Sequence, residues 1–243
     1  AENIHQCPIT LGHEIAGEVV SLGTGVTGVS VGDRCGVHPL GVTVPGYGRD
    51  GDYAAFHVAP AADLVPLPDG LSYELGALGT DAGMTSHHGV AVVAGVGAGD
   101  RVGIIGLGGL GQIGARIAVL LGAEGHAADP SPDARRLGEG RGVTRVVADA
   151  AELAGADLDS VIDFAGFAAT AQAAVRAIRV GGTVVMIGMG AHTTELVTAD
   201  VIHAKAIIRG SSGGTKADIE AVYRYLDAGR IVPVVEHLTF DRV

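Results

Sequence analysis

The sequence lacks the features that mark several classes of protein. It has no tryptophan and only two cysteines among its 243 residues, too few for a disulfide scaffold, so we expect a cytoplasmic protein. Basic residues are also scarce: 16 lysines and arginines stand against 27 acidic residues, a net charge of −11. This charge argues against nucleic acid or an anionic membrane as a partner. No apolar run could span a membrane, because Gln112 and Arg116 interrupt the most apolar stretch.

Three further absences narrow the possibilities. The first residues, AENIHQ, are polar, so we expect no secretory signal. The sequence shows no internal repeat at solenoid spacing and no low-complexity tract. Its length therefore predicts one large or two modest globular domains with an ample core.

Glycine is abundant, with 40 residues, and its arrangement is informative at one place. Residues 101–105 form a short apolar run that predicts a buried strand. Gly106, Gly108 and Gly111 then spell G-x-G-x-x-G, a helical pattern follows at once, and Asp129 ends the next short run. The motif alone would be weak in so glycine-rich a chain. Strand, glycine turn, helix and acid together predict a dinucleotide-binding unit.

Each residue of this unit has a physical role. Gly106 permits a tight turn, Gly108 lets the backbone approach a pyrophosphate, and Gly111 lets the helix pack against the strand. The helix N-terminus favours the pyrophosphate's negative charge. Asp129 is expected to accept hydrogen bonds from both hydroxyls of the adenosine ribose, which favours NAD over NADP. The run before Asp129, residues 124–128, has little β-propensity, so that strand would depend on its neighbours.

The rest of the chain predicts two kinds of structure. Glycine-bounded β runs over residues 13–37, with a further strand at 53–59, indicate a small barrel-like β domain. A helix capped by Ser72 would carry Asp81 and His88.

Strands and helices alternate after the glycine motif, which predicts a doubly wound parallel sheet, an α/β fold. Three helices are predicted: one that begins after Ser131, one over residues 168–180, and one that begins after Thr215. The predicted strands are 145–148, 160–164, 183–189, 206–209 and 234–240. Asp241 has the character of a helix cap near the last residue, so we expect a longer natural chain.

Nine stretches, taken in order, resemble the zinc-dependent medium-chain alcohol dehydrogenase family. They are LGHEIAGEVV, VGDRCGV, GDYAAFHVAP, LVPLPDGLSYE, TDAGMTSHHGV, GDRVGIIGLGGLGQIGARIAVLLGA, RVGGTVVMIGM, IRGSSGGTKAD and GRIVPVVE. The resemblance implies a GroES-like catalytic domain over residues 1–82, a Rossmann NAD-binding domain over 83–211, and a return segment, 212–243. It also implies an active site between the two domains.

The resemblance also implies roles for single residues. His13 of G-H-E matches the zinc-binding histidine, Glu14 the adjacent acid near the metal, Asp81 of D-A-G the third zinc ligand, and Thr85 a residue near the nicotinamide. The implied catalytic set is therefore His13, Glu14, Asp81 and Thr85, and the implied metal set is His13, Asp81 and Glu14. The implied cofactor-binding set is Gly106, Gly108, Gly109, Leu110, Gly111, Asp129, Thr85 and Arg135.

The chain departs from the family in two places. The family's first zinc ligand is a cysteine upstream of G-H-E, which this sequence does not include, so we expect the isolated chain to hold zinc weakly while still binding NAD. No C-x-x-C-x-x-C series follows Gly36, so we expect no structural zinc. Cys7 and Cys35 are interpreted as small buried apolar residues.

The leading interpretation is an NAD-dependent zinc alcohol dehydrogenase that interconverts a small or medium alcohol and its aldehyde or ketone. Two alternatives remain open: a zinc-independent quinone or enoyl reductase of the same superfamily, and a non-catalytic NAD-binding protein. On residue types alone, a His-Glu pair is more often structural than metal-binding. We also expect a homodimer or homotetramer, because residues 183–189 are apolar and by family analogy lie at a sheet edge.

Overall fold

The structure is a computed structural model that describes residues 7–41, 43–239 and 242. The chain divides into two compact units. Unit 1 combines the residues up to Met84 with those from Gly213 onward, and unit 2 is the continuous segment Thr85–Ser212. The boundary between Met84 and Thr85 falls within a helical stretch of the chain. No helix in the described ranges is both long and apolar enough to cross a membrane.

Unit 1 contains a small antiparallel sheet of three short strands in the order β1-β2-β3. The strands are β1 (Ile15–Glu18), β2 (Arg34–Val37) and β3 (Leu64–Pro66). Glycine turns between them keep each strand short, as the sequence predicts.

Helical segments of unit 1 come from two distant parts of the chain. The first part runs through α1 (Tyr73–Leu78), the π-helical η2 (Gly79–Gly83) and α2 (Met84–His87), whose residues after Met84 belong to unit 2 together with the π-helical η3 (His88–Val93). A short 3-10 turn, η1 (Ala61–Asp63), precedes β3. Ser72 caps α1, where its side chain accepts a hydrogen bond from the Leu75 N–H, as predicted.

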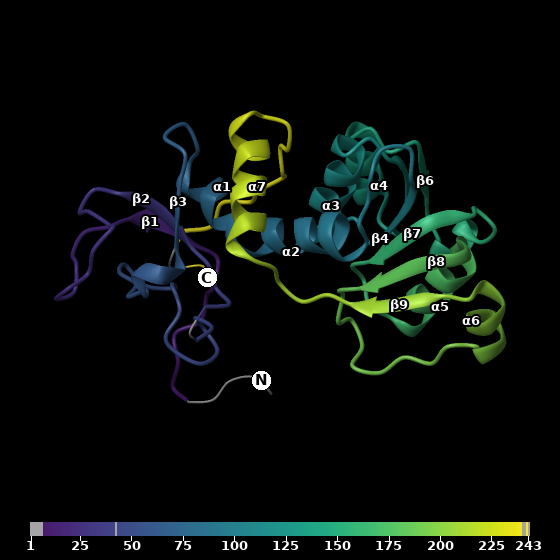
Figure 1. Cartoon of the computed structure of the whole chain (residues 1–243), viewed down its shortest axis with the longest axis horizontal. Helices are drawn as coiled ribbons and strands as arrows, with labels where there is room; N and C mark the ends of the chain where they lie inside the picture. The colour runs from purple at the N-terminus through teal and green to yellow at the C-terminus, as the bar shows by residue number, and fades with distance from the viewer. Residues whose placement is uncertain (1–6, 42, 240–241, 243) are drawn as a thin grey trace. The chain divides into compact units, whose positions relative to one another are not determined.

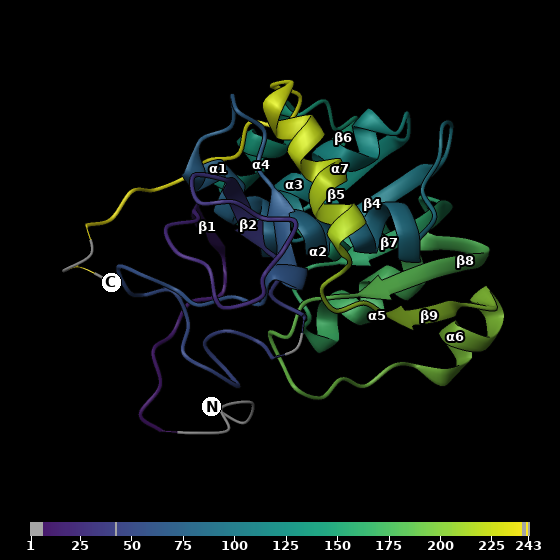
Figure 2. The ribbon, with the colours of Figure 1, turned by 60° about the vertical axis from the view of Figure 1, so that its left-hand side comes forward.

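The second helical part of unit 1 is α7 (Lys216–Asp227), which packs against η2 (Figure 1; Figure 2). Thr215 and Asp218 form a capping box at its start. Two contacts tie α7 to earlier segments: the Tyr223 hydroxyl donates to the Gly76 carbonyl at 3.0 Å, and the Lys216 ammonium donates to the Ala62 carbonyl. The return segment thereby completes the packing of unit 1.

Unit 2 contains a six-stranded parallel sheet in the order β6-β5-β4-β7-β8-β9. Its elements, in chain order, are β4 (Arg101–Ile105), α3 (Gly109–Leu120), β5 (Glu124–Ala128), α4 (Pro132–Gly140), β6 (Arg145–Val147), η4 (Ala150–Leu153), β7 (Leu158–Asp163), α5 (Ala168–Ala177), β8 (Ile178–Met186), α6 (Thr198–Ala204) and β9 (Ile207–Gly210). This is the Rossmann strand order.

Helices cover the sheet of unit 2 in two layers. α3 and α4 pack together and against β4, β5 and β6, whereas α5 and α6 pack together and against β8. Because the direction of strand addition reverses between β4 and β7, right-handed crossovers place the two pairs on opposite faces. Ile113 and Ile117 of α3 are at most 1 % exposed, and each contributes about 1.5–3 kcal/mol by burial.

Strand β5 has the composition EGHAA, which carries little β-propensity. It nevertheless pairs with β4 on one side and β6 on the other. Hydrogen bonding to β4 and β6 and packing against α3 therefore stabilise β5 despite its low β-propensity, as expected from the sequence.

Several predicted elements are wrong. Residues 53–59 contain no strand, and Phe56 and Val58 are 77 % and 87 % exposed, so no buried face stabilises one. Residues 234–239 also contain no strand, and Phe240 and Asp241 lie outside the described residues. Helix α6 was missed because it is only seven residues long and none of them is fully buried, so its apolar periodicity is weak.

The predicted helix over residues 168–180 ends at Ala177, where β8 begins directly. Ile178 is buried and pairs with Leu158 of β7. Gly181 and Gly182 therefore lie within β8, near an irregularity in the β7 register, instead of ending the helix. Burial of Ile178 against the sheet outweighs the helical pattern that precedes it.

The prediction that residues 183–189 form a sheet edge is wrong. β8 pairs with β7 on one side and β9 on the other. The edge strand on this side of the sheet is β9, whose four residues are all exposed, with Ile207 at 44 % and Ile208 at 38 %. The sheet therefore does end in an unpaired apolar strand, but that strand is β9 and not β8.

Candidate functional site

The dinucleotide motif forms the turn between β4 and α3. Gly106 has φ +85°, a conformation that side chains with a Cβ rarely adopt. A Cβ on Gly111 would lie 1.7 Å from the Gly106 carbonyl oxygen, so only glycine lets α3 approach the turn this closely. A Cβ on Gly108 would meet nothing within 4 Å, so the protein leaves space there that a pyrophosphate can use.

The first turn of α3 begins at Gly109 and includes Leu110 and Gly111. The first N–H groups of a helix have no partner within the helix. Together with the helix dipole they favour an anion at this end. The five predicted motif residues are therefore brought together in one turn.

Asp129 directly follows β5 and is held by two backbone groups. Its Oδ2 accepts from the Leu107 N–H at 2.7 Å, and its Oδ1 accepts from the Ser131 N–H at 2.8 Å. A carboxylate offers about four lone-pair positions, so each oxygen retains capacity for a ribose hydroxyl. The carboxylate is oriented before any ligand arrives.

Arg135 and Arg136 are the cations nearest to Asp129 in sequence. One Nη of Arg135 donates to the carbonyl oxygens of Asp129 and Pro130, at 2.9 and 2.8 Å. Arg136 pairs with Asp133 on the exposed side of α4. Arg135 thus stabilises the main chain that carries Asp129, and its charge is already engaged by carbonyl oxygens.

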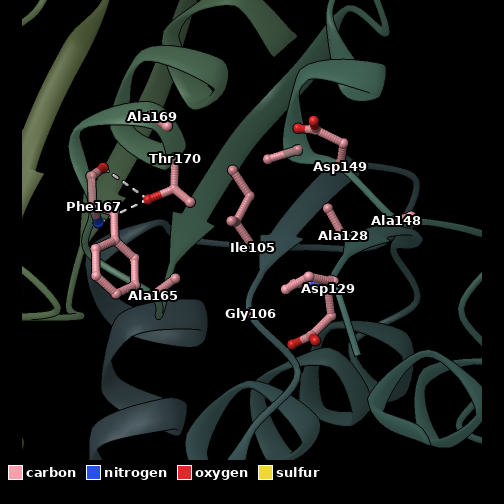
Figure 3. Close-up of a pocket in the computed structure, with 12 residues that line it drawn as sticks. Ile105, Gly106, Ala128, Asp129, Ala148, Asp149, Ala165, Phe167, Ala169 and Thr170 are labelled. Carbon is pink, nitrogen blue, oxygen red and sulfur yellow. Dashed lines mark hydrogen bonds between the residues drawn. The ribbon is translucent and has the colours of Figure 1, made fainter. Parts of the chain in front are cut away.

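A cavity of about 580 Å³ opens at the carboxyl ends of β4, β5, β6 and β7. Figure 3 shows Asp129 beside the Gly106 turn, Ile105 in the middle, and Asp149 at the opposite end. Ligands of doubly wound sheets bind at the carboxyl ends of the strands, next to the point where the strand order reverses. Its lining residues are Ile105, Gly106, Ala128, Asp129, Pro130, Ala148, Asp149, Ala150, Ala165, Phe167, Ala169 and Thr170.

Of these lining residues the sequence analysis named only Gly106 and Asp129 as site residues, and it missed Asp149, Phe167 and Thr170 among the others. Each follows a strand, β6 or β7, at the sheet edge that carries Gly106 and Asp129. The rule that ligands lie at the carboxyl ends of parallel strands could have identified them. They were missed because the sequence analysis assigned strands to residues 145–148 and 160–164 and a helix to 168–180 without considering a ligand at the ends of those strands.

The predicted metal residues lie in unit 1. The His13 Nε2 and the Asp81 Oδ2 are 3.0 Å apart and hydrogen-bonded, with both side chains 31 % exposed. The π-helical η2 carries Asp81 to this position, 68 residues along the chain from His13. The hydrogen bond to Asp81 raises the pKa of His13, against the opposing effect of burial. The ring of Tyr47 lies 5.5 Å from the His13 ring.

Glu14 makes a different contact. Its Oε1 accepts from the Ala82 N–H at 2.8 Å, and desolvation raises the pKa of its carboxyl group against the effect of that hydrogen bond. His13 and Glu14 therefore hydrogen-bond to two successive residues of η2, Asp81 and Ala82. Thr85, the fourth predicted catalytic residue, is 6 % exposed in α2.

The His13 and Asp81 pair fits a zinc ion as two of its ligands. Imidazole nitrogen and carboxylate oxygen bind zinc at about 2.0–2.2 Å, and tetrahedral geometry sets two such ligands about 3.3–3.5 Å apart. The pair would open by a few tenths of an ångström and release the shared proton. Among the described residues, however, no group of three histidine, cysteine or acidic side chains could hold a metal.

The two cysteines do not add to this donor set. Cys35 is buried at 9 % exposure, as predicted. Cys7 is exposed, so its interpretation as a buried apolar residue is wrong. It belongs to no strand or helix that would cover it.

Sequence and structure comparisons agree with this geometry. Residues 1–69 match the alcohol dehydrogenase GroES-like domain, and residues 109–228 match the zinc-binding dehydrogenase family. An alcohol dehydrogenase of Geobacillus stearothermophilus is 30% identical over 256 residues, which cover 94% of this chain and 75% of that protein.

Solved structures give the same result. Acetophenone reductase from Geotrichum candidum, in complex with NAD, superposes with a TM-score of 0.89 at 28% identity, over 96% of this chain and 75% of that chain. A protein from Sinorhizobium meliloti 1021, bound to NADP, superposes with a TM-score of 0.85 at 26% identity, over 94% of this chain and 75% of that chain. The chain therefore belongs to the medium-chain zinc alcohol dehydrogenase family of oxidoreductases.

Proposed function

We propose that this protein is an NAD-dependent oxidoreductase that interconverts an alcohol and its aldehyde or ketone by hydride transfer. The observation that carries the proposal is Asp129, fixed between the Leu107 and Ser131 amides at the mouth of the glycine turn. This arrangement supplies what the adenosine ribose and the pyrophosphate require. The relatives named alcohol dehydrogenase and the neighbour in complex with NAD support the same chemistry.

We assign the roles of the site residues as follows. Gly106, Gly108 and the first turn of α3, with Gly109, Leu110 and Gly111, bind the pyrophosphate, while Asp129 and Arg135 hold the ribose and its loop. Thr85 lies near the nicotinamide. His13 and Asp81 would hold zinc, with Glu14 beside them, and the metal would supply Lewis-acid chemistry that lowers the pKa of the substrate alcohol.

A second candidate is a zinc-independent reductase of the same superfamily. It is favoured by one observation, that the described residues bring together two metal donors and not three. Two measurements separate the candidates: the metal content of the purified protein, and NADH formation from simple primary and secondary alcohols before and after chelation. Chelator-resistant reduction of an enone, without alcohol oxidation, would support the second candidate. NAD binding without either reaction would support a non-catalytic protein.

We predict that the protein prefers NAD over NADP through Asp129. The carboxylate repels a 2′-phosphate, and the nearest cation, Arg135, is held by carbonyl oxygens. Loss of a hydrogen bond to a charged group costs about 1.5–3 kcal/mol, so Asp129→Ala should weaken NAD binding by about ten-fold or more. The measurement is a titration of each protein with NADH and NADPH, followed by fluorescence.

Asp133→Ala is the matched control for charge, because Asp133 lies on α4 and pairs only with exposed Arg136 in the contacts described above. It should leave NADH affinity unchanged. Equal affinity of the unmutated protein for NADPH would contradict the assignment of Asp129.

We further propose that two copies associate through the exposed edge of β9. An unpaired, apolar strand edge is a template for pairing with another chain. Sedimentation at micromolar concentration should show a dimer or a dimer of dimers, and Ile207→Lys should shift it toward monomer by adding charge to the edge. Exposed Ile202 on α6 offers a control, since Ile202→Lys adds the same charge away from β9. Purely monomeric unmutated protein would refute the proposal.

A further inference from the structure

Residues 43–58 of unit 1 contain no helix or strand, and one arginine holds them together from within. The Arg49 Nε donates to the Thr43 carbonyl at 3.1 Å, and one Nη donates to the Val58 carbonyl. The same Nη donates to the His57 Nε2 at 2.9 Å. Arg49 therefore joins the two ends of this segment, which we call the 43–58 loop.

The two hydrogen bonds of the His57 ring fix its protonation state. A guanidinium group can only donate, so the His57 Nε2 that faces Arg49 must be the acceptor. The proton of the neutral ring then lies on Nδ1, which donates to the Gly51 carbonyl at 3.2 Å. An imidazolium ring has no acceptor, and its positive charge would face that of Arg49. The network therefore forms only while His57 is neutral.

The surroundings of His57 favour this neutral state. Burial lowers the pKa of His57, and the Arg49 charge lowers it further. The hydrogen bond to Gly51 and the Asp52 carboxylate raise that pKa without outweighing the other two effects. Asp63, at the end of η1, is the carboxylate whose charge acts on Arg49. A proton is therefore taken up by His57 only below the usual range of a histidine, which centres on about pH 6.5.

The middle of the 43–58 loop lies against the residues that lead to His13. The Gly51 N–H donates to the Thr10 carbonyl at 2.8 Å. A Cβ on Gly51 would lie 2.1 Å from the Gly12 carbonyl oxygen, so the two backbones touch. The ring of Tyr47, from the same loop, lies 5.5 Å from the His13 ring. Movement of the loop would therefore release both the backbone before His13 and the ring beside it.

We propose that Arg49 is a positioning residue for His13 and that acidification releases it by protonating His57. The inference rests on the proposed function, because it concerns the metal site that contains His13. With His57 neutral, Arg49 and Gly51 hold the loop on residues 10–12. With His57 protonated, the hydrogen bond from Arg49 is lost and the loop separates from that backbone.

The direction of the pH dependence follows from His57. Its pKa is lower in the folded protein than in the unfolded chain. As the pH falls below about 6.5, the unfolded chain therefore takes up the proton first, and the folded state loses stability relative to it. The stabilisation by the network is complete above this pH and decreases below it.

Hydrogen exchange of the Gly51 amide, followed by NMR, measures the release of the loop, because this amide donates to Thr10. Between about pH 7.5 and about pH 5.5, its protection should fall about ten-fold or more after correction for intrinsic exchange, the effect of losing one hydrogen bond to a charged group. The amides of β4, in unit 2, provide the reference and should keep their protection.

Substitutions separate the role of His57 from that of Arg49. His57→Gln keeps an acceptor for Arg49 and does not titrate, so protection should change less than about two-fold over the same pH range. Arg49→Met removes the donors and should give low protection at both pH values, whereas Arg49→Lys keeps the charge without the fork of donors and should restore part of it. His203→Gln, at an exposed histidine of α6, is the matched control and should behave as the unmutated protein.

Zinc affinity tests the connection to His13. It is measured by competition with a chelator, and Arg49→Met should lower it about ten-fold or more, as for other groups that support a metal ligand. Thermal melts show whether each variant is folded. If Arg49→Met does not fold, the comparison is made with Arg49→Lys.

Three outcomes decide the inference. Protection of Gly51 that is the same at both pH values, or that falls as far in His57→Gln as in the unmutated protein, would overturn the role of His57. Unchanged zinc affinity in the folded Arg49 variant would overturn the positioning role. Failure of the folded, unmutated protein to bind zinc would overturn the proposed metal site and the connection to His13, while the exchange measurement would still decide the contact between Arg49 and His57.

Discussion

His13→Ala is expected to abolish alcohol oxidation and to remove the bound metal. Changes to groups that merely support zinc ligands cost about 10–100-fold in affinity, so loss of a ligand should cost at least about 100-fold. The Asp81 carboxylate, now paired with His13 at 3.0 Å, would be left without that partner. Binding of NADH should be unchanged, because the nucleotide-binding residues belong to unit 2. Metal content, NADH formation and NADH titration together make the measurement.

His237→Ala is the control for His13, since His237 is an exposed histidine of unit 1. It should leave metal content and turnover unchanged. If His13→Ala retained stoichiometric zinc and normal turnover, both the ligand assignment and the zinc chemistry would be wrong.

Gly111→Ala is expected to produce the largest effect within unit 2. The added Cβ would lie 1.7 Å from the Gly106 carbonyl oxygen, a backbone atom that cannot rotate away. To relieve this clash, α3 has to move away from the turn. Overpacking of a protein core typically lowers the free energy of unfolding by about 1–3 kcal/mol, and we expect a loss of that size. The same movement displaces the amides at the start of α3, so NADH binding should be lost. Denaturant unfolding and NADH titration measure the two effects.

Alanine substitutions at two other glycines should affect either NADH binding or stability, but not both. A Cβ on Gly108 meets no protein atom within 4 Å, so Gly108→Ala should keep stability and still weaken NADH binding by filling the space beside the pyrophosphate. A Cβ on Gly140 of α4 also meets nothing, and Gly140→Ala should raise stability by up to about 1 kcal/mol with no change in binding. Normal NADH affinity in Gly111→Ala would show that the close approach of α3 is not required.

The nucleotide-binding unit could be predicted closely because its signals are local. Glycine spacing, the apolar run of β4 and Asp129 lie within one short segment, and backbone geometry converts them directly into a turn and a helix. The pairing of His13 with Asp81 was available only through family resemblance, since 68 residues separate them. No periodicity in the sequence specifies that η2 brings the two side chains together.

The failures have a common physical cause. β8 could not be bounded from sequence because Ile178 pairs with Leu158 of β7 and lies with it in one buried apolar cluster, which a window around residue 178 does not show. Residues 53–59 have strand-like composition but no buried face. The helix or strand propensity of a segment determines its secondary structure only where tertiary packing favours the same structure.

The connection of α7 to the start of unit 1 has a consequence for folding during synthesis. The hydrogen bond between Tyr223 and Gly76 joins residues 147 positions apart, whereas unit 2 is one uninterrupted segment. As the chain leaves the ribosome, unit 2 emerges whole before α7 does, and domains fold as units as they emerge. The part made first is thus the part completed last, and the surface around Gly79 that Tyr223 covers stays open until the return segment arrives. During that interval the chain exposes apolar surface, the condition under which folding intermediates tend to aggregate.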